Sequence, residues 1–163
     1  MKKPILSAVA AAITVGALFT TTASYADNYG PRHYAVTITN ITRGQILAPP
    51  AVVAHNRHYE LFTLGAPSTP ELATLAETGN GAPLLDVAAA MPSVYKTALG
   101  GGAILPGKSQ TIMIETTGEF PGISVAAMLV STNDGFMAVR GVQARNRAAV
   151  SVESEAYDAR SAG

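Results

Sequence analysis

The sequence predicts an all-β protein, an antiparallel β-sandwich of about eight strands that carries one or two short helical insertions. Several short segments alternate apolar with polar or small residues, which is the period of half-buried strands. Residues 123–130 form a nearly continuous apolar run, typical of a central strand buried on both faces. A helix signal between the early strands predicts the insertion.

The first expected strands lie in the N-terminal half. Residues 34–39 alternate with period 2 and predict a half-buried strand. Residues 45–54 predict a second extended region. Pro49 and Pro50 cannot donate to a ladder, so they point to an edge or irregular segment there. Residues 59–63 predict a short third strand.

The helical insertion has recognisable boundaries. Thr69 is a suitable N-cap, and Pro70 follows it at the first helical position, where its fixed φ is favourable. Gly79 or Gly81 can end this helix. Residues 83–91 predict a second short helix.

The remaining expected strands lie after the glycine run at residues 100–102. Residues 112–116 alternate, residues 123–130 are the buried central strand, and residues 136–142 and 149–152 supply two more.

The N-terminus reads as a signal peptide. Lys2 and Lys3 precede an uncharged, mostly apolar stretch, and Ser24 and Ala26 provide the small residues of a cleavage site. We expect residues 1–26 to be removed, which leaves 163 − 26 = 137 residues as one sandwich domain, residues 27–163. No later segment is long and apolar enough for a transmembrane helix, so none is expected after cleavage. The protein is expected to be exported, to the periplasm or outside the cell.

Composition limits the function classes. The chain has no cysteine, so an exported domain must rest on its core, on a metal, or on both. The formal net charge is +0, and loss of Lys2 and Lys3 makes it about −2. Nucleic-acid binding usually requires a clustered basic surface, so it is not expected.

Two short motifs suggest chemistry but have plainer explanations. Residues 102–109, GAILPGKS, match the phosphate-binding loop pattern, yet the following residues alternate like a strand and no helix follows. A Pro-Gly turn is therefore the favoured interpretation. His55 and His58 have a spacing that could chelate zinc on a helix, but their surroundings are extended, so solvated or loop-packing histidines are favoured.

Two acidic turns are the candidate metal ligands. Asp134 follows the buried central strand in TNDGF, and Asp158 lies in EAYDA near the end of the chain. Carboxylates presented at strand ends suit a hard cation such as calcium, which prefers six to eight oxygen ligands. Asn133 and Glu155 lie nearby in sequence. Asn-Asp-Gly is equally a turn signal, so the residues alone leave both interpretations open.

The chain resembles the spondin domain family over most of the residues that follow the signal peptide. The matching blocks are 34–42 (YAVTITNIT), 48–56 (APPAVVAHN), 61–80, the ILPGKS turn at 104–109, 124–139 and 155–159. The last two blocks, SVAAMLVSTNDGFMAV and EAYDA, are the most specific. The nearest type is the small exported bacterial protein that consists of this domain alone.

The resemblance implies a C2-like sandwich with a calcium ion at one end. Asp134 matches the aspartate of the TND-type turn, and Asp158 matches the first acidic residue of a terminal YDAGTE-type loop. The third expected carboxylate is missing, because Ala162 stands in its place and Arg160 replaces a glycine. The ending Arg160-Ser161-Ala162 therefore implies a calcium site with fewer charges.

Three functions follow from these expectations. The first is a non-enzymatic, calcium-binding adhesion or interaction module whose partner is a protein, a glycan or an envelope surface. The second is a C2-like domain whose open end contacts a lipid or glycan surface, with Phe136, Arg140 and Arg160 as contact residues. The third is a small hydrolase, which would need a pocket that unites His55 with a serine and an acid, since no nucleophile motif is visible.

Overall fold

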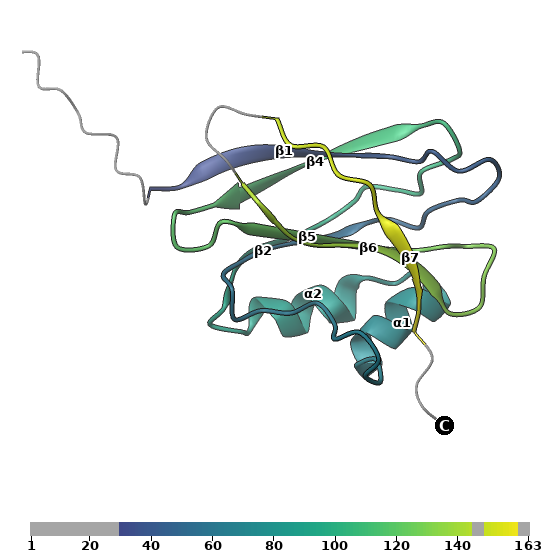
Figure 1. Cartoon of the computed structure of the whole chain (residues 1–163), viewed down its shortest axis with the longest axis horizontal. Helices are drawn as coiled ribbons and strands as arrows, with labels where there is room; N and C mark the ends of the chain where they lie inside the picture. The colour runs from purple at the N-terminus through teal and green to yellow at the C-terminus, as the bar shows by residue number, and fades with distance from the viewer. Residues whose placement is uncertain (1–29, 145–148, 160–163) are drawn as a thin grey trace, which may run out of the picture.

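The protein folds into three layers, seen in a computed structural model that describes residues 30–144 and 149–159. A two-stranded sheet lies over a five-stranded sheet, and two helices cover the other face of the larger sheet (Figure 1). The architecture is consistent with the predicted all-β sandwich with two short helices. The expected signal peptide lies outside the described residues.

The larger sheet has the strand order β3-β2-β5-β6-β7, and every neighbouring pair is antiparallel. Its strands are β2 (Ala51–His55), β3 (Val94–Leu99), β5 (Gly122–Met128), β6 (Gly135–Gln143) and β7 (Glu155–Asp158). All seven residues of β5 are buried. The prediction of a central strand buried on both faces is therefore confirmed.

The smaller sheet pairs only two strands, β1 (Arg32–Thr39) and β4 (Ser109–Thr116), which run antiparallel. Residues of β1 alternate between half-buried and exposed, as their period-2 pattern predicts. On the exposed face, hydroxyl pairs join the strands: Thr37 with Thr111, and Thr39 with Ser109, both at 2.8 Å between oxygens. Such cross-strand pairs help fix the register.

The helices form where the sequence predicts them. Helix α1 (Pro70–Thr78) begins after Thr69, whose Oγ1 accepts a hydrogen bond from the backbone N–H of Leu72. It ends at Gly79, whose φ of 72° is the left-handed cap conformation that glycine adopts at low cost. Helix α2 (Ala82–Ala89) follows after a short turn.

The core divides into two clusters, one on each face of the larger sheet. The helix-side cluster joins Leu72, Leu75 and Phe136 with alternate residues of β2 and β5. The inter-sheet cluster joins Ile38, Ile112 and Ile114 of the smaller sheet with the intervening residues of β2 and β5. Burial on both sides explains why β5 is continuously apolar rather than alternating.

Some element predictions were wrong. Residues 59–63 and 149–152 have no strand structure, and the last strand begins instead at Glu155. Strand β3 was missed. Pro49 and Pro50 directly precede β2, so they leave its ladder intact, and β2 lies inside the sheet rather than at its edge. The described residues hold seven strands, close to the expected eight.

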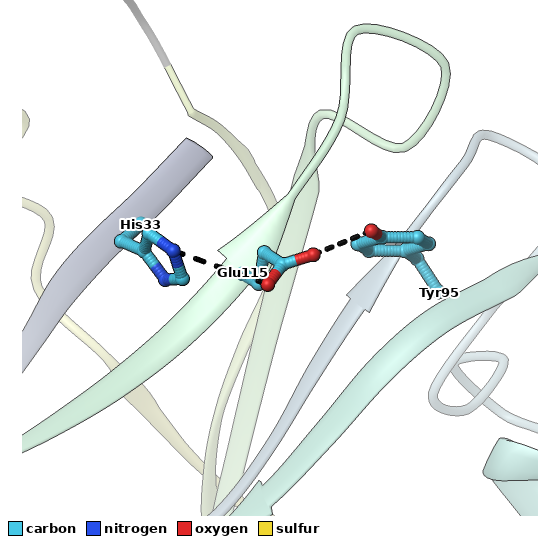
Figure 2. A network of polar contacts seen from close by, with 3 residues as sticks. All are labelled: His33, Tyr95 and Glu115. Atoms are coloured by element: carbon cyan, nitrogen blue, oxygen red, sulfur yellow. Dashed lines mark hydrogen bonds and ion pairs between the residues drawn. The ribbon is translucent and has the colours of Figure 1, made fainter. Parts of the chain in front are cut away.

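A polar bridge links the two sheets at one end (Figure 2). Tyr95 of β3 donates its hydroxyl hydrogen to Glu115 of β4 at 2.5 Å, and the imidazole of His33 of β1 lies 4.0 Å from the other carboxylate oxygen. The hydrogen bond to Glu115 raises the pKa of the Tyr95 hydroxyl. The Tyr95 ring also stacks on Phe120, with 5.6 Å between centroids. These contacts fix the position of β3 relative to the smaller sheet.

Candidate functional site

The structure brings the backbones of the two predicted metal ligands side by side. Asp134 immediately precedes β6, and Asp158 is the last residue of β7. Gly135 faces Asp158 in the antiparallel pair, and the backbone N–H of Ala159 donates to the carbonyl of Asp134 at 2.9 Å. Residues 24 positions apart in sequence therefore meet at one end of the larger sheet.

A tight hairpin turn holds Asp134 at this place, called here the hairpin end. The Thr132 hydroxyl donates to the Leu129 carbonyl at 2.7 Å and accepts the backbone N–H of Gly135 at 2.9 Å. Asn133 is exposed, Asp134 is half-buried, and Asp158 is exposed. The hairpin end thus carries oxygen-bearing side chains on a turn that is held by hydrogen bonds of Thr132.

Among the described residues, the hairpin end carries two of the expected metal-binding carboxylates, Asp134 and Asp158. No group of three or more histidine, cysteine, aspartate or glutamate residues that could hold a metal occurs within residues 30–144 and 149–159. The altered ending at Arg160-Ser161-Ala162 lies outside the described residues, so its effect on the site stays a prediction. In this part of the chain the donor set consists of two carboxylates with neighbouring turn oxygens.

The opposite end of the larger sheet holds a buried pair that the sequence did not reveal. Nε2 of His55, the last residue of β2, lies 2.8 Å from Oγ of Ser124 in β5. Both residues are buried, His55 being 5% and Ser124 2% exposed. They lie 69 positions apart, and only the pairing of β2 with β5 brings them together. Sequence spacing offered no signal for this contact.

The protons of this pair can be assigned from its neighbours. Nδ1 of His55 lies 2.7 Å from the carbonyl of Asn56, which only accepts, so Nδ1 carries a hydrogen. Burial lowers the pKa of His55, more than the hydrogen bond to Asn56 raises it. Nε2 of the neutral ring therefore accepts the Ser124 hydroxyl hydrogen, while Oγ of Ser124 accepts the backbone N–H of Gly141 at 2.9 Å.

A β-bulge shapes this end. Ser124 faces two residues of β6, Arg140 and Gly141, because the register shifts between Ile123 and Val125. Gly141 adopts a φ of 61°, which favours glycine, and this conformation directs its N–H toward Ser124. The bulge thus replaces a ladder hydrogen bond with one to a side chain.

Close approach of His55 also requires a glycine on β5. A Cβ built on Gly122 would lie 3.0 Å from Cε1 of the His55 ring and 3.0 Å from the His55 backbone oxygen. The backbone oxygen belongs to the β2 ladder and has little room to move. The His55 ring is also packed against Tyr59, with 4.9 Å between centroids, and burial raises the pKa of Tyr59 to about 12. The ring position is therefore fixed from several sides.

A pocket of about 320 Å³ lies beside this pair, between the sheet and the loop that follows β2. Two exposed arginines, Arg57 and Arg140, stand among its lining residues. The guanidinium of Arg140 lies over the ring of Phe62, 4.9 Å from its centroid. Glu60 also lines the pocket, but its carboxylate accepts from Thr63, and the orienting partner of His55 is a carbonyl rather than an acid.

The other sequence motifs behave as their plainer interpretations predict. His58 is exposed and accepts a hydrogen bond from Arg57, while His55 is buried, so the two do not form a chelating pair. Gly107 forms a turn with φ of 72°, and β4 follows this turn rather than a helix. The GAILPGKS segment therefore lacks the helix that a phosphate-binding loop needs.

The proposed surface contacts beside the aspartates need one correction. Phe136 is 1% exposed and packs in the helix-side core, because Phe136 and Ala138 of β6 face the helices. It cannot contact a lipid or glycan surface. Arg140 is exposed but lies toward the bulge end of β6, and Arg160 lies outside the described residues.

Two comparisons with known proteins found no relative of this chain. A search against models of protein families found no match, and a search of curated proteins also found none. The spondin resemblance therefore stays a prediction. Within residues 30–144 and 149–159, neither helix has the length and apolar character needed to cross a bilayer.

Proposed function

We propose that this protein is an exported, non-enzymatic spondin-type interaction module, acting at the cell surface, in the periplasm or in an extracellular matrix. A calcium ion at the hairpin end would order its loops for contact with a protein, glycan or envelope surface. One observation carries the proposal: pairing of β6 with β7 sets Asp134 and Asp158 next to each other at one sheet end.

The donor chemistry supports a hard cation. Two carboxylates, the amide of Asn133 and turn carbonyls are oxygen ligands, which calcium prefers, and water completes such coordination shells. Affinity rises with the number of ligand charges. Two carboxylates fit a weak site, with a dissociation constant of roughly 0.1–1 mM, as in extracellular calcium modules.

A calcium titration of thermal stability tests the proposal. Ligand that binds only the folded state raises stability by mass action, so the unfolding temperature should rise at millimolar calcium and not at equal magnesium. The variant Asp134→Asn should lose this rise, whereas Glu77→Gln, on the exposed side of α1, should keep it. An unfolding temperature that ignores calcium in the unaltered chain would remove the metal from the proposal.

A small hydrolase remains a second candidate because of the His55–Ser124 contact. A serine hydroxyl hydrogen-bonded to a neutral imidazole is the pairing that nucleophilic catalysis uses. Two features favour a structural role instead. Both residues are buried, and the group that orients the His55 ring is the carbonyl of Asn56 rather than a carboxylate. Incubation with a fluorophosphonate probe separates the two: a phosphonyl adduct on Ser124, absent in Ser124→Ala, would establish a reactive serine, and an unlabelled protein would reject it.

A further inference from the structure

A second cavity opens at the side of the sandwich, away from the pocket beside His55. It measures about 850 Å³ and lies between β1, the inner face of β6 and residues 149–154, which lead into β7. We call this space the side cavity, and residues 149–154 the strap. Its volume lies within the range of small-molecule sites.

The side cavity exists because the two sheets differ in width. Strand β4 of the smaller sheet packs against β2 and β3, and inner-face side chains of β2 and β5, such as Val52 and Ala127, are fully buried. Among the described elements, β6 has no comparably close backbone packing against β1 or β4. Its inner-face residues Met137, Val139 and Val142 remain only half-buried and line the side cavity.

The walls of the side cavity are apolar. Val36 and Ile38 of β1 face it from one side, and Val139 of β6 forms part of its floor. Val150 and Val152 of the strap are 47% and 50% exposed, although valine usually gains from burial. An apolar molecule that entered would remove these surfaces from water, which is the main driving force for such binding.

Polar side chains in the lining are almost all uncharged. The neutral polar side chains include Asn40, Thr42 and Thr132, which already hydrogen-bond within the protein, and Gln45. Nε2 of Gln45 is buried without a hydrogen-bond partner, so turning this amide toward a ligand oxygen would satisfy an orphaned donor. The charged residues among the described lining are both acidic, Glu153 and Glu155, and therefore disfavour an anionic head.

We propose that the side cavity binds the single hydrocarbon chain of an uncharged amphiphile, such as a long-chain alcohol. The chain lies between β1 and β6 under the strap, and the hydroxyl head reaches the neutral groups around Gln45. This site adjoins the hairpin end at Thr132, but its lining includes neither Asp134 nor Asp158, so binding should not depend on calcium.

Titration calorimetry of the full chain with octanol, decanol and dodecanol tests the proposal. Each methylene that leaves water contributes a constant increment, so affinity should rise about fourfold per added methylene until the side cavity is full. The proposal would be overturned by an affinity that does not change with chain length, or by no binding at all. The side cavity would then hold only water.

Matched variants locate the binding. Val36→Phe places a ring in the side cavity and should weaken dodecanol binding by at least about tenfold. Met113→Phe adds a ring on the exposed face of β4, outside the lining of the side cavity, and should leave binding unchanged. Equal loss in both variants would show that the chain binds elsewhere.

A second variant avoids the risk that Val36→Phe misfolds. Val152→Asp changes a half-exposed residue of the strap, so folding should be retained while dodecanol affinity falls at least about fivefold, because a charge in an apolar wall disfavours the bound chain. Unchanged affinity in a folded Val152→Asp protein would remove the strap from the site.

Head-group chemistry gives an independent test. Dodecanol should bind at least about tenfold more tightly than dodecanoate, since the acidic lining repels a carboxylate. Equal affinities would overturn the assignment of an uncharged head. The titration is repeated with a chelator: retained binding separates this site from the calcium proposal, and lost binding would contradict their independence.

Discussion

The two ends of the five-stranded sheet satisfy their polar groups in opposite ways. At the hairpin end, backbone hydrogen bonds join the ends of β6 and β7, while Asp134 and Asp158 carry like charges near solvent. At the other end, His55 and Ser124 are neutral and buried, and their polar atoms have hydrogen-bond partners.

This difference separates two uses of polar residues. A cation that binds carboxylates of the folded state alone stabilises that state by mass action. A buried neutral pair whose polar atoms are hydrogen-bonded stabilises the fold without a ligand. Removing one partner leaves a buried polar group without a hydrogen bond, which lowers stability. Ions that bind the hairpin end should therefore change the stability of the protein. At the other end, substitution of His55 or its protonation in acid should change the stability.

The largest expected effect comes from His55→Ala. Loss of the buried ring leaves a cavity and removes a partner of Ser124, so the free energy of unfolding should fall by about 2–4 kcal/mol. His58→Ala is the matched control, because His58 is exposed. Urea unfolding of both variants measures the difference, and equal stabilities would contradict a structural role for the buried pair.

A somewhat smaller loss is expected for Gly122→Ala. The added Cβ would meet the His55 backbone oxygen and ring at 3.0 Å, so the free energy of unfolding should fall by about 1–3 kcal/mol. Gly102→Ala meets no atom within 4 Å and serves as the control. Equal free energies of unfolding for the two variants would show that the close approach of His55 to Gly122 does not require a glycine.

Acid should destabilise the protein through His55. Burial lowers the pKa of His55 in the folded protein, so the unfolded chain binds the proton more readily. The contribution of neutral His55 to stability is therefore fully present above the unfolded pKa of about 6.5. Stability should fall as pH drops from there through the folded pKa. The slope should disappear in His55→Ala, and a slope that persists would assign it to other groups. Unfolding curves from pH 7.5 to 5 measure it.

The smallest effect is expected at the hairpin end without calcium. Asp158→Asn removes the charge of an exposed side chain and keeps its size, so the free energy of unfolding of chelator-treated protein should change by less than about 1 kcal/mol. With calcium at about ten times its dissociation constant, the unaltered chain should gain about 1.4 kcal/mol and the variant should not. A large loss in chelator would mean that the Asp158 carboxylate is structural.

Periodic segments made much of the fold predictable. The alternation in β1 and β4 and the continuous apolar run of β5 each reflect which faces are buried. Helix α1 carries its own boundary signals, and the structure uses Thr69 and Gly79 as expected. In these segments local pattern and tertiary burial agree.

The missed elements lack such agreement. Strand β3 has half-buried residues on both faces and therefore shows no alternation. The strap alternates like a strand, but it lies beside the uncovered part of the sandwich, and the last strand forms only where β6 offers a free edge. The His55–Ser124 contact depends on strand pairing across 69 positions, which no local pattern encodes.

The pairing of β1 with β4 has a consequence for the order of folding. Thr39 and Ser109 are partners although 70 positions separate them, and no intervening strand joins their two-stranded sheet. A chain that emerges N-terminus first presents β1 long before its partner exists. Closing so large a loop is entropically costly, so the smaller sheet should assemble late, after β2 and β5 have formed the floor on which it packs. Until then β1 is an unpaired edge, which makes it the segment of the nascent chain most in need of protection from other strands.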